Sequence, residues 1–225
     1  MTSFQLKALA ALFMVLDHVG AVFFPTQVWL RIIGRLSFPI FAWLIAEGVF
    51  YTKNLKKYFK RILAFAFISQ IPYGLLFNTF ILNVLFTFSL SILLLAIISD
   101  KLKLSSVQRI LAFYFIFILS FFVDGGFFGL LLPVIFYYFK TDRKLQTILA
   151  AGLIAVFTLS QYLLSNHLQI QPVTPIFIQL FSVLSLPLIF LYNQKQGPKL
   201  KYFFYIFYPL HLGILLFISE YLGRP

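Results

Sequence analysis

Six ionisable residues lie inside long apolar stretches of this chain, where a buried charge costs about 3 kcal/mol or more. They are Asp17, His18, Arg31, Arg35, Glu47 and His211. An imidazole acts as a general base near neutral pH. A guanidinium group can hold a phosphate or carboxylate, or stabilise a developing oxyanion. The residue types therefore predict proton transfer beside a bound anion or a polarised carbonyl.

Helix geometry brings several of these groups to one level. A helix over 4–24 followed by one over 28–51 places His18 and Arg35 each about 10 Å below the same end, at about 1.5 Å per residue. Arg31 and Arg35 are four residues apart and share a helix face. The link between the two helices is short, so we expect them to be antiparallel neighbours.

Other polar residues fall in the same half of the predicted spans and indicate a pocket that opens at that end. They are Gln70, Asn83, Thr87, Asp124 and His211. Glu47 lies toward the opposite end, beyond Pro39. We expect it to pair with a loop lysine or to line an inner entrance.

Structural roles compete with catalytic ones for each group. Asp17 could form an ion pair with Arg31 or Arg35, and because it points about 100° round the helix from His18, a direct pair with that imidazole is not required. His18 and His211 could each serve as helix–helix hydrogen-bonding groups. His167 is expected in a solvated outer loop.

The composition is that of a membrane protein and not of a soluble domain. Hydrophobic residues make up 61% of the 225 positions, charged residues 11%, and Phe alone contributes 31. The absence of cysteine excludes disulfides, thiolate nucleophiles and cysteine metal sites, and we expect no metal. The charge of +12 resides in short loops, which favours membrane orientation over nucleic-acid binding.

The apolar stretches predict an all-α, polytopic helical bundle that forms one domain over 1–225. Nine membrane-spanning helices are expected, at 4–24, 28–51, 58–77, 81–99, 108–123, 126–139, 145–164, 175–192 and 202–220. The fifth and sixth are short and are split by Asp124-Gly125-Gly126, so a partly re-entrant pair is an alternative.

Basic residues alternate between the connections, as expected for a chain that crosses the membrane at every span. The rich connections are 52–61, 100–109, 140–144 and 193–201, the last with Lys195, Lys199 and Lys201, whereas those near 25–27, 78–80, 124–125 and 165–174 hold no Lys or Arg. Loops rich in Lys and Arg stay inside, so the N-terminus is predicted to be cytoplasmic and the C-terminus extracytoplasmic.

The sequence around these residues resembles the TraX family, which is named for a member that acetylates F-pilin. The resemblance begins with Leu16-Asp17-His18-Val19-Gly20, with the segment from Leu30 to Phe41, and with Ala46-Glu47-Gly48. It continues through Ser69-Gln70-Ile71-Pro72-Tyr73, Asn83-Val84-Leu85-Phe86-Thr87, Asp124-Gly125-Gly126 and Tyr208-Pro209-Leu210-His211-Leu212.

The resemblance implies a cytoplasmic-membrane acetyltransferase that moves an acetyl group from cytosolic acetyl-CoA to an amine or hydroxyl outside. The acceptor would be a pilin N-terminus, a peptide or a surface glycan, and the other partners would be membrane lipids and no nucleic acid. His18 and Asp17 would be catalytic, and Arg31, Arg35 and Glu47 would bind the acetyl-CoA co-substrate. The residues expected to orient the substrate are His211, Asn83, Gln70, Asp124 and Tyr208. A small anion transporter or channel and a non-catalytic assembly factor are the alternatives.

Overall fold

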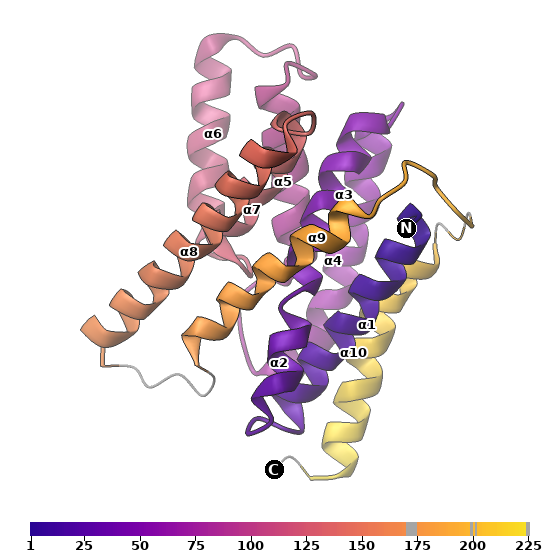
Figure 1. The fold of residues 1–225 in the computed structure, drawn as a ribbon, viewed down its shortest axis with the longest axis vertical. Helices are drawn as coiled ribbons and strands as arrows, with labels where there is room; N and C mark the ends of the chain where they lie inside the picture. The colour runs from indigo at the N-terminus through magenta and orange to yellow at the C-terminus, as the bar shows by residue number, and fades with distance from the viewer. Residues whose placement is uncertain (170–174, 199, 201, 224–225) are drawn as a thin grey trace.

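The computed structural model describes residues 1–169, 175–198, 200 and 202–223, and these residues form an all-helical bundle (Figure 1). Lys199 and Lys201, two of the predicted inner-loop lysines, lie outside the described residues. The elements in chain order are α1 (Ser3–Val22), α2 (Val28–Gly34), α3 (Ser37–Tyr51), α4 (Leu55–Phe77), α5 (Val84–Ile98), α6 (Ser106–Ser120), α7 (Gly126–Tyr138), α8 (Arg143–His167), the 3₁₀ helix η1 (Ile176–Leu184), α9 (Ser185–Phe190) and α10 (Phe203–Tyr221).

Two of the predicted helices are each divided into two segments. The stretch 28–51 is interrupted at Arg35 and Leu36, and the stretch 175–192 changes from 3₁₀ to α-helix at Ser185. Pro39 and Pro187 each lie at the third position of the second segment, where they lack the N–H that would bond the carbonyl four residues earlier. The prediction of one continuous helix over 28–51 is therefore wrong, although Pro39 is visible in the sequence.

Helix α3 lies at the centre of the bundle and contacts α1, α5, α7 and η1–α9. Its residues Ile40, Trp43, Ile45 and Val49 belong to the largest buried apolar cluster. Helix α10 packs against α4 and α1, while α6 packs at the other side of the bundle against α5 and α7. Helices α8 and η1 pair with each other and slant away from α1 and α10 (Figure 1).

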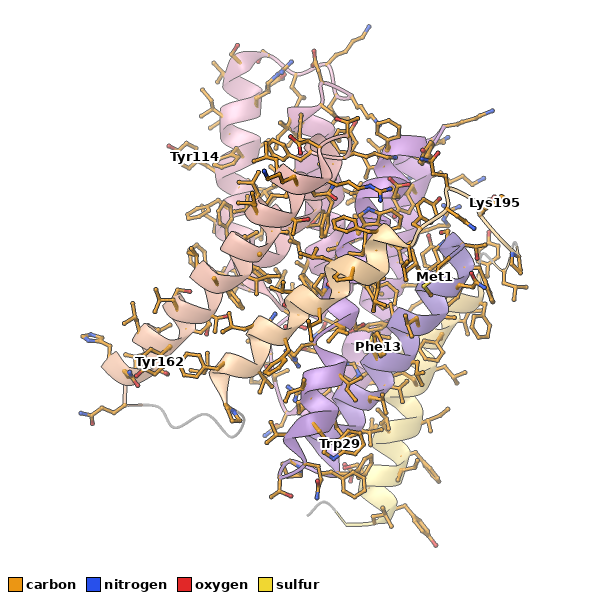
Figure 2. The ribbon with its side chains drawn as sticks, viewed as in Figure 1. Met1, Phe13, Trp29, Tyr114, Tyr162 and Lys195 are labelled. Carbon is orange, nitrogen blue, oxygen red and sulfur yellow. The ribbon has the colours of Figure 1, made fainter. Side chains whose placement is uncertain are left out.

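Exposed apolar side chains cover the outer helices, as a lipid-facing surface requires. Tyr114 on α6 is 60% exposed, and in Figure 2 it projects from the outer side of the bundle. Trp29, at the start of α2, is 55% exposed at the end expected to face outward. Within the described residues, α1, the combined α2–α3, α8 and α10 are long and apolar enough to cross a membrane. Helices α5, α6, α7 and η1–α9 are apolar but shorter.

The four basic connections lie at the same end of the molecule. The N-terminus, the loops after α3, α5 and α7, and the described part of the loop after α9 are in the upper half of Figure 1. The α1–α2 loop and the end of α10 are at the lower end. The fold thus places the basic connections apart from the α1–α2 loop, in agreement with the alternating pattern for that loop.

Two glycines allow α1 and α2 to approach closely. A Cβ atom built on Gly34 would lie 2.3 Å from the Asp17 Cβ and 2.6 Å from its Cα. A Cβ built on Gly20 would lie 2.8 Å from the Leu30 Cβ. All three distances are shorter than the contacts that real Cβ atoms make, so glycine is required where these two helices meet.

We expect Gly34→Ala to lower the free energy of unfolding by about 1–3 kcal/mol, because the added methyl group overpacks a backbone contact. Gly152→Ala is the matched control, since a Cβ there meets no atom within 4 Å and alanine favours the helix by up to about 1 kcal/mol. Thermal unfolding of both variants in detergent checks this. Equal melting temperatures for the two variants would contradict the close-contact interpretation.

Candidate functional site

A cavity of about 190 Å³ is lined by residues from α1, α3, α5, α7, α8, η1 and α10, and its lining includes five of the ten predicted site residues. Its polar lining comes from Asp17, His18, Arg35, Ser37, Asp124, Gln179 and Tyr208. Its apolar lining includes Met14, Phe38, Phe41, Val84, Phe88, Phe128 and Phe157. The chamber is therefore largely aromatic, with acid–base groups concentrated on the α1–α2 side.

Asp17 binds both predicted arginines. Its Oδ2 accepts hydrogen bonds from Arg31 Nη1 at 2.7 Å and from Arg35 Nη2 at 2.5 Å, while its Oδ1 accepts one from Arg35 Nε at 3.1 Å. Arg31 Nη1 also donates to the Asp17 carbonyl at 2.9 Å. The Asp17 side chain is only 12% exposed, so this is a largely buried ion triad. One carboxylate thus fixes both guanidinium groups, as the ion-pair alternative anticipated.

Arg35 lines the cavity, whereas Arg31 contacts Asp17 and does not line the cavity. Arg35 lines the chamber, and its Nη1 lies 3.5 Å from Gln179 Oε1 on η1. Arg31 is not among the lining residues, and its Nη1 donates to the carboxylate and to the carbonyl of Asp17. Gln179 was missed by the sequence analysis, although a lone amide in the apolar segment Ile176–Leu184 is a usable signal.

His18 pairs with His211 and not with Asp17. Its Nδ1 lies 2.9 Å from His211 Nε2, and the two rings stack with their centroids 5.1 Å apart. His211 Nδ1 lies 3.0 Å from the Phe207 carbonyl oxygen, one turn earlier on α10. The phenyl ring of Phe77 contacts His18 edge-on, with a centroid distance of 5.2 Å.

These contacts assign the tautomers of both neutral rings. The Phe207 carbonyl can only accept, so His211 Nδ1 carries a proton and its Nε2 is an acceptor. His18 Nδ1 must then donate to His211 Nε2. The lone pair on His18 Nε2 therefore remains available for proton transfer, and His18 lines the cavity.

Asp124 reaches the cavity from the turn between α6 and α7. That turn is formed by Gly125 and Gly126, whose φ angles of 79° and 53° favour glycine. It is attached to α5 by a 2.5 Å hydrogen bond from Thr87 Oγ1 to the Asp124 carbonyl. Asp124 thus faces the same chamber as Arg35, while Thr87 holds the turn in place.

Gln70 and Asn83 meet each other outside the cavity lining. Gln70 Oε1 accepts from the Asn83 backbone N–H at 2.9 Å and from Asn83 Nδ2 at 2.8 Å. Asn83 also caps α5 by accepting from the Leu85 N–H at 3.0 Å. The structure gives both residues a role in joining α4 to α5, and their predicted role in orienting substrate stays a prediction.

Glu47 lies at the basic end, away from the chamber. Its Oε1 is 2.5 Å from Lys140 Nζ, which confirms the predicted pairing with a loop lysine. The Lys140 ammonium also lies 4.0 Å from the Phe50 ring centroid and 4.2 Å from that of Tyr51. Glu47 is not among the residues that line the cavity, and its predicted role in binding acetyl-CoA stays a prediction.

Comparison with known proteins assigns the family. The family model described as TraX protein matches residues 3–219. The chain belongs to the TraX family. It is 31% identical over 236 residues to a probable fimbrial assembly protein FimC, serogroup H1, of Dichelobacter nodosus, covering 95% of this chain and 94% of that protein. It is 35% identical over 82 residues to an uncharacterized protein RP591 of Rickettsia prowazekii, covering 36% of this chain and 31% of the relative. No solved structure matches the chain significantly.

Asp17→Asn tests the ion triad. Loss of the carboxylate charge leaves two largely buried guanidinium groups without a counter-ion, so we expect the free energy of unfolding to fall by about 3–5 kcal/mol. Thermal unfolding in detergent is the measurement. Asp100→Asn is the matched control, because its 2.5 Å bond to Arg109 is exposed and such pairs contribute about 1 kcal/mol or less. Similar losses of stability in both variants would contradict a special role for Asp17.

Proposed function

We propose that this TraX-family membrane protein is an acetyltransferase that moves an acetyl group from acetyl-CoA to an amine or hydroxyl of an extracytoplasmic acceptor. The observation that carries the proposal is the hydrogen-bonded His18–His211 pair, which leaves His18 Nε2 free as a base in a chamber that Arg35 also lines. Family membership supports the same reading.

The transfer step uses His18 as a general base. His18 Nε2 accepts the proton of the attacking N–H or O–H, and the acceptor atom forms a bond to the acetyl carbonyl carbon. The carbon–sulfur bond of the thioester then breaks, and the proton passes to the departing thiolate to give free CoA. His211 holds the His18 ring in the required tautomer and lets positive charge spread over two imidazoles during the step.

Arg35 is the residue best placed to stabilise the oxyanion that forms on the acetyl carbonyl. Its position is fixed by Asp17 through two hydrogen bonds, so little reorganisation is needed during reaction. Arg31 acts indirectly, because it holds the carboxylate that holds Arg35. Asp17 is therefore assigned a positioning role, and not that of a partner to the catalytic imidazole.

The acceptor is proposed to be a protein or peptide of a surface fibre, with a surface glycan as the other possibility. A relative that is 31% identical over 95% of this chain carries the name of a probable fimbrial assembly protein. The aromatic lining of Phe38, Phe41, Phe88 and Phe128 would suit an apolar group next to the acceptor atom. A small anion transporter is less well supported, since Asp17 already neutralises one of the two guanidinium charges.

The proposed topology has nine membrane crossings in the cytoplasmic membrane, with the basic end inside. Acetyl-CoA would then approach from the basic end, and the acceptor from the end that holds the α1–α2 loop. Nine crossings require α7, with 13 residues, to span a locally thin part of the bilayer or to be shielded by its neighbours.

Single cysteines test this orientation directly, because the natural chain has none. We expect Thr26→Cys to react with a membrane-impermeant maleimide in intact cells, and Lys103→Cys to react only after permeabilisation. Both positions are exposed in loops at opposite ends. The reverse labelling pattern would contradict the proposed orientation.

His18→Ala tests the catalytic base. We expect acetyl transfer from labelled acetyl-CoA to fall by about 10²–10⁴-fold, the usual contribution of a general base. His167→Ala, which removes an exposed imidazole at the end of α8, should leave the rate unchanged. Unchanged turnover in a folded His18→Ala protein would eliminate the mechanism.

His211 is tested separately as a positioning residue. His211→Ala should lower kcat and alter its pH profile with little change in KM, since it touches His18 and not the cavity. His211→Gln keeps an acceptor for the His18 Nδ1 proton and should restore part of kcat. A fall in stability with an unaltered pH profile in both variants would indicate a purely structural residue.

A membrane assembly factor without catalysis is the second candidate, and the name of the fimbrial relative favours it. It predicts loss of surface fibres in cells that lack the protein and no acetyl difference on fibre subunits. Intact-mass measurement of surface polymers and peptides from cells with and without the protein distinguishes the two candidates.

A further inference from the structure

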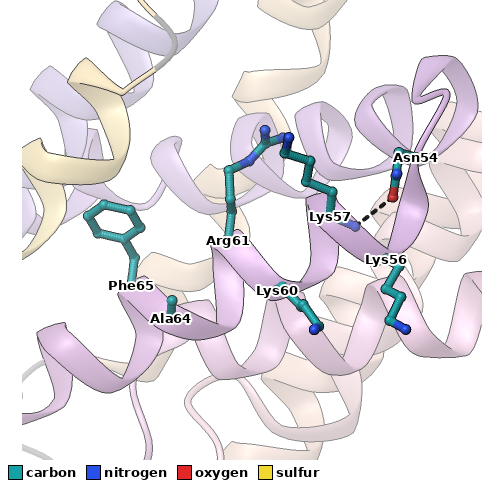
Figure 3. Close-up of a pocket in the computed structure, with 7 residues that line it drawn as sticks. All are labelled: Asn54, Lys56, Lys57, Lys60, Arg61, Ala64 and Phe65. Atoms are coloured by element: carbon teal, nitrogen blue, oxygen red, sulfur yellow. Dashed lines mark hydrogen bonds between the residues drawn. The ribbon is translucent and has the colours of Figure 1, made fainter.

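A second cavity, of about 370 Å³, lies at the start of α4, at the basic end of the molecule (Figure 3). Four basic side chains line it, together with Asn54, Ala64 and Phe65; they are Lys56, Lys57, Lys60 and Arg61. None of these residues belongs to the chamber around His18. The cavity is therefore a separate feature of the fold.

The positive charge of this cavity has no counter-charge in its lining. None of the six acidic residues of the chain is among the lining residues. Three of those acids form ion pairs elsewhere: Asp17 with Arg31 and Arg35, Glu47 with Lys140, and Asp100 with Arg109. Four cations thus line one hollow whose lining contains no carboxylate, with Lys57 and Arg61 on one side of α4 and Lys56 and Lys60 on the other (Figure 3).

The position of these cations opposes the dipole of α4. The first turn of a 23-residue helix carries a partial positive charge, and Lys56 and Lys57, which lie in that turn, are each unfavourable there by about 0.3–1 kcal/mol. The first turn of α4 contains no acidic residue. Retention of a loop on the inner side does not need cations on the helix itself, since loop positions such as Lys103 serve equally well. An anion in the cavity would remove this conflict.

Arg61 is held in place with unused hydrogen-bonding capacity. Its guanidinium carbon lies 5.7 Å from the Tyr205 ring centroid on α10, and its Nε is buried without a hydrogen-bond partner among the described residues. Lys57 precedes it by one turn on the same helix face. Figure 3 shows the Lys57 and Arg61 side chains extending toward the same region, an arrangement of like charges that a shared anion would stabilise.

We propose that this cavity is a phosphate-binding site in which Arg61 and Lys57 hold a phosphate group and Lys56 and Lys60 balance its further charge. Two sources share this chemistry. One is the headgroup of an acidic phospholipid at the basic membrane face, and the other is a soluble polyphosphate such as CoA. The soluble source rests on the proposed acetyltransferase function, whereas the lipid source does not.

The soluble source is tested by calorimetric titration of CoA and of inorganic pyrophosphate into the protein in phosphatidylcholine nanodiscs. Lys57→Gln/Arg61→Gln should weaken binding at least tenfold relative to the natural protein. Lys103→Gln/Lys144→Gln removes the same charge from exposed positions outside the cavity, and should change affinity less than twofold. Lys57→Gln/Lys60→Gln changes only exposed side chains and replaces the first variant should loss of Arg61 impair folding.

The lipid source is tested with the same proteins in nanodiscs that also contain phosphatidylglycerol. Native mass spectrometry after release should find phosphatidylglycerol retained by the natural protein and by the control variant, and lost from the cavity variant. A selective effect in either arm identifies the source of the phosphate.

The proposal is overturned if the natural protein binds neither ligand class, or if the cavity and control variants weaken binding equally in both arms. Acetyl transfer is measured independently on the same preparations. Active natural protein that shows no selective binding would refute this site and leave the proposed function intact. Selective binding by a protein without transfer activity would support this site and refute the proposed function.

Discussion

The ion triad of Asp17 with Arg31 and Arg35 is the interaction on which the rest of the site depends. Arg31 lies on the short helix α2 and Arg35 follows directly after it at the break, and a single carboxylate from α1 holds both guanidinium groups at 2.5–3.1 Å. Burial makes the contact an all-or-none constraint, because either partner alone would be an unpaired charge in an apolar bundle. The packing of α1 against α2 therefore requires that this triad form.

Two glycines and one proline allow α1 and α2 to pack together at this position. Gly20 and Gly34 remove side chains where α1 and α2 touch, and Pro39 ends α2 so that Arg35 lies at the break between the two segments. Ser37, two residues later, donates to the Ala10 carbonyl at 2.8 Å and fastens α3 to α1. The same short segment thus sets the chain direction, the helix spacing and the position of Arg35. A change in any one of them would displace the others.

The sequence predicted depth well and direction around the helix poorly. The rise of about 1.5 Å per residue placed His18, Asp17 and Arg35 at one level, and the structure brings all three to one cavity. Which groups pair depends on the rotation of each helix, which is decided by packing far along the chain. The partner of His18 is His211, 193 residues away, and no local pattern could identify it. Gln70 and Asn83 bond to each other and do not line the chamber. Pro39 was visible in the sequence, but the sequence alone did not show that the helix would be divided into two segments there.

The two cavities of this small bundle differ in the charges that line them. Around the chamber, the formal charges of Asp17, Arg31, Arg35 and Asp124 sum to zero, so a diffusing anion would gain little by entering. Such balance suits a reaction whose reactants are a neutral thioester and an amine or hydroxyl, since charge appears there only in the transition state. The cavity at the start of α4 has the opposite character, with four cations and no carboxylate. Capture of a negatively charged group and transfer of a neutral acyl group make incompatible electrostatic demands on one pocket. The proposed functions assign these two demands to separate cavities of the bundle.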